Sequence, residues 1–282
     1  MLCRRCSAGK MWSNVEVSVM LQEIKQVIFS WRFLGAACLM FVCLSGYAAC
    51  DWIFVYDFDI AYRPSSLQLT LGGIFFGGTM LMIPLCAALP AGILQAEEVQ
   101  TGMIEWKLIR GTIHRYTAAK FCGAFLGAGS AVCLAFFAHA LLWNLLATPC
   151  DPSINEYLAL PFAEDCIYAP WQNVCYSLPI YLWMAGGIFF CGGIWGIVSI
   201  TAALYTRDKL LAIAIPFCIY FLWHYGLPGI LLGIRPFPHP ADLYNDALTV
   251  PMIWRSLMVY AVLLVATCGL YMGKLKRSYQ YG

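Results

Sequence analysis

Long uncharged stretches alternate with short charged ones along this chain of 282 residues. A bilayer core requires about 20 apolar residues per helix, so each long stretch predicts a membrane-spanning helix. Six spans are expected, at residues 33–50, 71–94, 121–146, about 176–205, about 210–230 and about 251–273. An even number of spans places both ends of the chain on the same side of the membrane.

Composition favours the membrane class independently of the pattern. Hydrophobic residues make up 61% of the chain and charged residues 11%, whereas a soluble domain carries about a quarter charged residues. The net charge of +2 gives no broad basic surface for nucleic acid. We therefore expect an all-α polytopic membrane protein that does not bind nucleic acid.

Basic residues are distributed unevenly between the two sides. Fourteen Lys and Arg residues fall on the side of the termini, whereas Arg63, Arg235 and Arg255 fall on the other side. Cytoplasmic loops are enriched in Lys and Arg, so this distribution predicts that both termini lie in the cytoplasm.

The segment before the first span has its own periodicity. Its apolar positions recur at helical spacing opposite polar ones; they are Val17, Met20, Leu21, Ile24, Ile28 and Trp31. This pattern predicts an interfacial amphipathic helix, with a cytosolic extension of the first span as the alternative. The chain then divides into a tail with this helix (1–32), a six-helix domain (33–273) and a cytoplasmic tail (274–282).

The polar stretch between the second and third spans carries the strongest functional signal. Its apolar residues again fall three or four apart: Val99, Met103, Trp106, Ile109, Ile113 and Tyr116. Acids at its start (Glu97, Glu98) and bases near its end (Lys107, Arg110) suit the helix dipole. We expect one helix from Glu97 to about Arg110, with a Trp106–Arg110 cation–π contact. Gly111 would allow a turn, and Thr112 would cap the third span.

No energy source for transport is encoded in the chain itself. The span centres lack Asp, Glu, Lys and Arg, which disfavours an ion-coupled carrier. No Gly-rich phosphate-binding loop is present either. A transporter of this composition would need a partner ATPase that grips rigid elements on the inner side. The stretch after the second span is one candidate, and the short segment 205–209 is another.

A motif in the longer candidate resembles a known family. An acidic pair and a glycine are followed by Ile-x-x-x-x-x-Arg-Gly-Thr-x-x-Arg-Tyr-x-x-x-Lys, in a pattern similar to the first cytoplasmic loop of ABC type-2 permeases. The matching residues are Glu97, Glu98, Gly102, Ile104, Arg110, Gly111, Thr112, Arg115, Tyr116 and Lys120. The order of elements is also similar, from the interfacial helix through six spans to an inner C-terminus.

The resemblance implies the membrane subunit of an ATP-driven transporter in the plasma membrane, with a prokaryotic source expected. Such a permease pairs with a second permease chain, identical or different, and with two ATPase subunits. ATP and Mg would bind those ATPases, and no catalytic, cofactor-binding or metal residue is expected here. Export of apolar or amphiphilic cargo, such as a drug, antimicrobial peptide or lipid, is expected. The implied coupling helix and second contact comprise Glu97, Glu98, Gly102, Glu105, Trp106, Arg110, Arg115, Arg207, Asp208 and Lys209.

Two interpretations from other classes stay open. A stand-alone membrane binding or immunity protein would need no ATPase. An intramembrane peptidase would use Glu97 and Glu98 with His139 and His224, although Gly102 stands where that motif needs Arg. Separately, three cysteines of one outer loop, Cys150, Cys166 and Cys175, allow one disulfide in any of three pairings.

Overall fold

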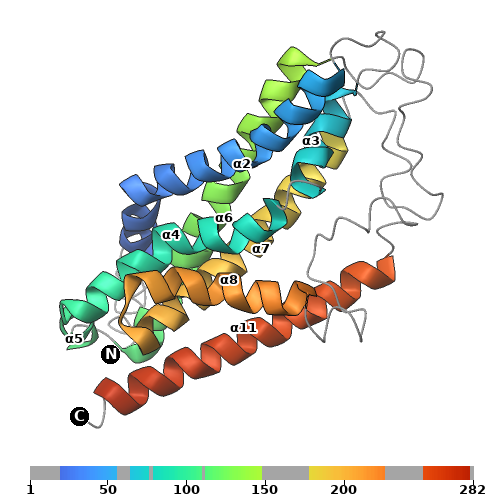
Figure 1. Cartoon of the computed structure of the whole chain (residues 1–282). Coiled ribbons are helices and arrows are strands. Elements are labelled where there is room, and N and C mark those ends of the chain that lie inside the picture. The colour runs from blue at the N-terminus through green and yellow to red at the C-terminus, as the bar shows by residue number, and fades with distance from the viewer. Residues whose placement is uncertain are drawn as a thin grey trace, which may run out of the picture.

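A computed structural model of the chain describes residues 20–55, 64–75, 79–109, 112–147, 178–225 and 250–279. Every regular element in these ranges is a helix (Figure 1). The helices are α2 (Trp31–Val55), α3 (Ser66–Phe75), α4 (Thr79–Gln100), α5 (Met103–Ile109), α6 (Ile113–Leu146), α7 (Leu178–Thr206), α8 (Lys209–Tyr225) and α11 (Val250–Tyr279). Residues 20–28, before α2, are also helical.

Five of these helices, α2, α4, α6, α7 and α11, contain segments long and apolar enough to cross a membrane. They coincide with five of the six expected spans, so the all-α membrane class is confirmed. The expected fifth span corresponds to α8, which has 17 residues. Residues 226–249 after it lie outside the described part of the chain, and six spans with both termini inside stay a prediction.

The expected second span is divided between two helices. Helix α3 ends at Phe75 and α4 begins at Thr79, and residues 76–78 between them are outside the described ranges. Helix α4 also runs past the expected end of the span, to Gln100. This extension carries its last two turns, with their charged residues, to the polar end of the molecule.

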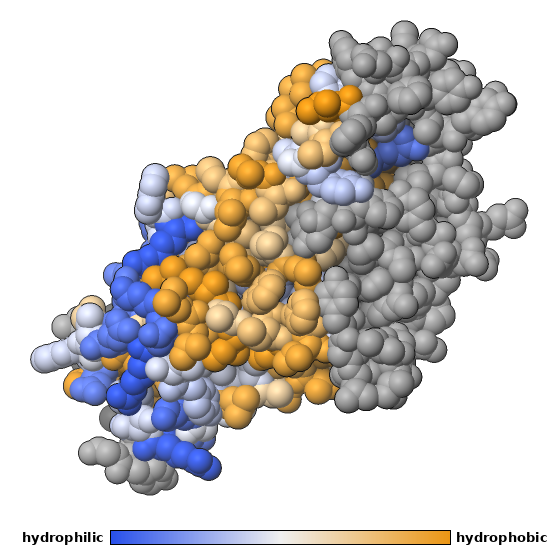
Figure 2. Space-filling view, viewed as in Figure 1, coloured by the Kyte–Doolittle hydropathy of each residue, from blue (hydrophilic) through white to orange (hydrophobic). Residues whose placement is uncertain are grey.

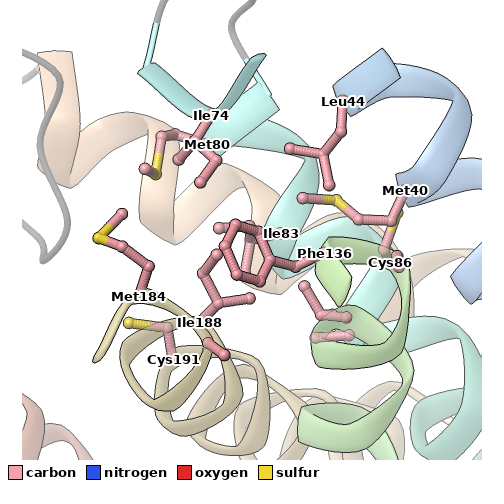
Figure 3. Close-up of a cluster of buried hydrophobic side chains, with 14 of the residues drawn as sticks. Met40, Leu44, Ile74, Met80, Ile83, Cys86, Phe136, Met184, Ile188 and Cys191 are labelled. Carbon is pink, nitrogen blue, oxygen red and sulfur yellow. The ribbon is translucent and has the colours of Figure 1, made fainter. Parts of the chain in front are cut away.

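The core lies where α2, α4, α6 and α7 meet. Phe136 of α6 is fully buried and lies among side chains from the other three helices (Figure 3). Glycines allow close approach here: a Cβ on Gly196 of α7 would lie 2.9 Å from the Ala124 carbonyl oxygen of α6. In a membrane, such contacts between small residues are a main source of helix association.

One buried polar contact compensates for a proline in α8. Pro216 has no N–H, so it leaves the carbonyl of Ala212 without its helical donor. The Ser199 hydroxyl of α7 donates to that carbonyl at 2.9 Å. Gly92 of α4 leaves room for Ser199, since a Cβ there would clash with the serine side chain. The three helices are therefore locked together at this level.

Polar residues gather at one end of the molecule. Helix α5 and the C-terminal end of α11 lie at this end (Figure 1). The hydrophilic surface is concentrated there, next to a broad hydrophobic surface (Figure 2). The candidate functional site lies at this end, hereafter the α5 end.

Candidate functional site

Helices α4 and α5 meet at a corner made by Thr101 and Gly102. The φ of Gly102 is +71°, in the left-handed region that glycine enters without steric cost. The Thr101 N–H donates to the Glu97 carbonyl at 2.9 Å and closes α4. The expectation of one helix from Glu97 to Arg110 is therefore wrong, because the left-handed glycine ends α4 and α5 begins at Met103.

This corner reverses the electrostatic role of the acidic pair. Glu97 and Glu98 lie in the last turn of α4 rather than the first turn of a new helix. A helix C-terminus carries partial negative charge and disfavours a carboxylate. Each of these carboxylates contacts two cationic side chains from other segments, which offsets the unfavourable position.

Glu98 belongs to a buried cluster of two acids and two lysines, called the charge quartet here. Its Oε1 lies 2.7 Å from Lys107 Nζ and 2.6 Å from Lys120 Nζ. Glu23 contacts the same lysines, with its Oε1 and Oε2 each 2.6 Å from a lysine Nζ. The side chains of Lys120 and Glu23 are only 5% and 7% exposed. The four charges cancel, and removing any one would leave a buried charge uncompensated.

The quartet connects four segments that are distant in sequence. Glu23 comes from residues 20–28, Glu98 from α4, Lys107 from α5 and Lys120 from α6. Helix α6 also approaches residues 20–28 through glycine, since a Cβ at Gly127 would clash with Val27. The helix before α2 thus packs on the protein with Glu23 and Val27 buried. Its expected apolar stripe, by contrast, is exposed at Leu21 and Trp31.

Contacts within the quartet stabilise the charged forms of Glu23 and Lys107. Burial alone would raise the pKa of the Glu23 carboxyl, but Lys120 and Lys107 outweigh it and hold this pKa below its ordinary value. Burial would lower the pKa of Lys107, yet Glu98 and Glu23 raise it above its ordinary value. Both groups are therefore more firmly ionised than they would be in water.

Glu97 forms a second cluster on the other side of α4, called the bridge cluster. Its Oε1 accepts from Arg32 Nη2 at 2.6 Å and from Lys209 Nζ at 2.8 Å. Arg32 lies at the start of α2 and Lys209 at the start of α8. Consecutive acids at the end of α4 therefore connect this helix to two different sets of neighbours.

The second segment expected to contact an ATPase is the corner between α7 and α8. Arg207 adopts a φ of 56° there, and its carbonyl accepts from Gln100 Nε2 at 2.7 Å. Asp208 caps α8, because its Oδ1 accepts from the Leu210 and Leu211 N–H groups at 2.8 and 3.0 Å. With Lys209 bound to Glu97, the structure brings this corner to the end of α4 (Figure 1).

Helix α5 buries one face and exposes another. Ile104 is fully buried, whereas Met103, Trp106 and Ile109 are 48%, 64% and 78% exposed. The apolar stripe expected from Val99 to Tyr116 is therefore not one face: its two ends are buried and its middle is exposed. An exposed apolar strip on a polar surface is typical of a contact with lipid or protein.

The remaining predicted site residues have separate outcomes. Thr112 caps α6 as expected, with its Oγ1 accepting from the Arg115 N–H at 3.4 Å. Glu105 is exposed on α5. Arg110, Gly111, the Trp106–Arg110 contact and the cysteines Cys150, Cys166 and Cys175 lie outside the described residues.

Sequence reasoning missed several residues that hold the α5 end together. Glu23 and Arg32 were assigned only to the interfacial segment, and Gln100 was given no role. Their contacts connect positions 84, 65 and 107 residues apart, and no local spacing indicates such a pairing. The one available signal was charge: Glu23 is an acid on a helix expected to lie on lipid.

His139, one residue of the peptidase interpretation, lies far from the acidic pair, and the side chain of His224 is outside the described part of the chain. His139 follows Lys120, a partner of Glu98, by 19 residues on α6, which corresponds to about 28 Å along a helix. His139 instead packs near α2 and α3, with its Nδ1 3.1 Å from Ser45 Oγ and its Nε2 3.4 Å from the Thr70 carbonyl. His139 and the acidic pair therefore do not form one site.

Within the described ranges, no three His, Cys, Asp or Glu side chains gather as a metal site requires. No family model, curated protein or solved structure matches this chain. The helices define an all-helical protein of the multi-pass membrane class. Its function is therefore inferred from the α5 end.

Proposed function

We propose that this chain is the membrane subunit of an ATP-driven transporter and that a separate ATPase docks on α5. One observation carries the proposal: α5 exposes Trp106 and Ile109 while Lys107, on the same helix, is fixed in the charge quartet. A helix of seven residues is not stable alone. Its attachment by buried charges suits a surface that receives force from a partner.

The contacts give a route for that force. A displacement of α5 moves Lys107, which pulls on Glu98 of α4 and on Glu23 of the preceding helix. Separating these groups would leave buried charges uncompensated, so the segments move together. Glu97 extends the connection from α4 to α2 and α8.

The charge distribution supports a cytoplasmic position for the α5 end. Lysines of both clusters lie there, and Lys276 and Arg277 lie in the last turn of α11 at the same end. Cytoplasmic segments of membrane proteins are enriched in such residues. An ATPase in the cytoplasm would meet this end.

ATP and Mg would bind the partner ATPases and supply the energy of transport. The role of this chain is to dock them through α5 and the α7–α8 corner. A second permease chain completes the transporter in this proposal. Export of an apolar or amphiphilic cargo is supported by the apolar character of the core, in which Ile and Ala are the commonest buried residues (Figure 3).

Co-purification tests the docking surface. The tagged chain is isolated from its native membranes in mild detergent, as wild type, as Trp106→Ala and as Trp254→Ala. Trp254 is a matched control, since it is 60% exposed but lies on α11 in its first turns. Interface tryptophans contribute about 2 kcal/mol or more, so Trp106→Ala should reduce recovery of the ATPase at least tenfold.

The three preparations separate the alternatives. An ATP-binding protein recovered with the wild type and Trp254→Ala, but lost with Trp106→Ala, supports the proposal. Equal recovery with the wild type and both variants would contradict docking on α5. Recovery of a folded wild-type chain without an ATPase would favour a stand-alone binding or immunity protein.

A further inference from the structure

The bridge cluster differs from the charge quartet in its charge balance. Arg32 and Lys209 share the single carboxylate of Glu97, which leaves a surplus positive charge. Both cations contact the same oxygen, Oε1, at 2.6 and 2.8 Å. Two cationic groups are therefore held close together at a fixed position on the surface.

These cations have donors to spare. A guanidinium carries five N–H donors and an ammonium three, and Glu97 accepts one from each. The Arg32 side chain is 30% exposed and that of Lys209 45% exposed, whereas Lys120 in the quartet is 5% exposed. A further anion has access to both cations of the bridge cluster, whereas Lys120 of the quartet is closed to it.

The surroundings of the cluster are amphiphilic. Arg32 lies between Trp31 and Leu34, which are 84% and 51% exposed, and Lys209 precedes Leu210, which is 77% exposed. The cluster joins the first turns of α2 and α8 to the last turn of α4. The hydrophilic surface of the molecule borders a broad hydrophobic surface (Figure 2), and in a membrane protein such a border lies at the depth of the lipid headgroups.

We propose that Arg32 and Lys209 bind the phosphodiester of an anionic phospholipid. The phosphate oxygens accept the spare N–H donors of both side chains in charge-assisted hydrogen bonds. The acyl chains lie along the exposed apolar residues beside them. A zwitterionic lipid is bound less well because its own cation opposes the surplus positive charge. Lys209 also belongs to the α7–α8 corner of the proposed docking surface, so lipid binding is measured on the chain without an ATPase.

Native mass spectrometry of the full chain tests the site. The protein is purified in detergent and titrated with phosphatidylglycerol or phosphatidylcholine, as wild type, Lys209→Gln, Arg32→Gln and Lys276→Gln. Lys209→Gln keeps the Arg32–Glu97 pair and therefore the fold. Lys276 is the matched control, an exposed lysine in the last turn of α11.

Wild type should prefer phosphatidylglycerol, and Lys209→Gln or Arg32→Gln should each weaken its binding about fivefold. Lys276→Gln should leave binding unchanged. Equal losses in all three variants would overturn the site in favour of diffuse attraction, and unchanged binding in Lys209→Gln would overturn it outright. Displacement of phosphatidylglycerol by millimolar inorganic phosphate would overturn the lipid assignment and indicate a site for a free anion.

Discussion

Lys120 of α6 and Glu98 of α4 form a buried ion pair, with 2.6 Å between Nζ and Oε1. The pair closes the charge quartet beneath α5, and its members come from helices long enough to cross a membrane. Helix α5 is therefore connected to these two helices through charges as well as through the buried apolar contacts of Ile104.

The quartet should be sensitive to the loss of one member. Lys120→Met keeps the length of the side chain but leaves two buried carboxylates facing one lysine, and should destabilise the protein by about 3–5 kcal/mol. Lys25→Met, at an exposed lysine on residues 20–28, should change stability by less than about 0.5 kcal/mol. Unfolding in detergent, followed by circular dichroism, measures both.

Charge balance can be separated from packing in the same cluster. Adding Glu98→Gln to Lys120→Met restores one carboxylate to one lysine, and the double variant should recover part of the lost stability. Additive losses in the double variant would show that the quartet acts through packing rather than through cancelled charge.

The quartet's contribution to stability should be independent of pH around neutrality. The pKa of Glu23 is lowered from 4.5, so its contribution to stability is present above that value and lost as pH falls through the folded pKa. The pKa of Lys107 is raised from 10.5, so its contribution is present below that value and lost as pH rises through the folded pKa.

Stability attributable to the quartet should therefore be constant between about pH 6 and pH 9. The measurement is the difference in unfolding midpoint between wild type and Lys107→Met across this range. A difference that disappears within the range would contradict the lowered pKa of Glu23 or the raised pKa of Lys107.

Any side chain introduced at Gly102 should destabilise the protein. A Cβ there meets no atom within 4 Å, so the cost of Gly102→Ala is the left-handed backbone alone, about 1–2 kcal/mol. Gly35→Ala on α2 is the control, since its Cβ also meets nothing within 4 Å and its backbone is helical. That variant should be neutral or slightly more stable. Equal unfolding midpoints for Gly102→Ala and Gly35→Ala would contradict a left-handed backbone at Gly102.

The hydroxyl of Ser199 should contribute more to stability than an ordinary serine hydroxyl in a helix. Ser199→Ala leaves the Ala212 carbonyl, already without its donor because of Pro216, unsatisfied at a cost of about 1–3 kcal/mol. Ser130→Ala is the control, because Ser130 donates to carbonyls of its own helix that keep their helical donors. If Ser199→Ala lowered stability no more than Ser130→Ala, the Ala212 carbonyl would have another hydrogen-bond donor.

The sequence predicts the long helices well because they depend on local composition. The ends of α2, α6, α7 and α11 lie within a few residues of the expected spans or extend them into the polar surface. The cap at Thr112 was also predictable, since capping depends on a few adjacent residues.

The single helix expected in the polar stretch is wrong for a physical reason. Apolar spacing from Val99 to Tyr116 is helical on both sides of Gly102, and a periodic pattern does not reveal that a left-handed glycine ends one helix there. The ion pairs of the two clusters are not predictable from local sequence for another reason. Arg32 and Lys209 meet Glu97, and Glu23 meets Lys107, only when helices distant in sequence pack together.

Photo-crosslinking in living cells tests the central claim most directly. A photoreactive amino acid is placed at Trp106, which is 64% exposed on α5, and in parallel at Trp254 on α11. The account predicts an adduct with an ATP-binding protein from position 106 and none from position 254. An adduct with lipid alone from position 106, in a chain that is folded in the membrane, would contradict it.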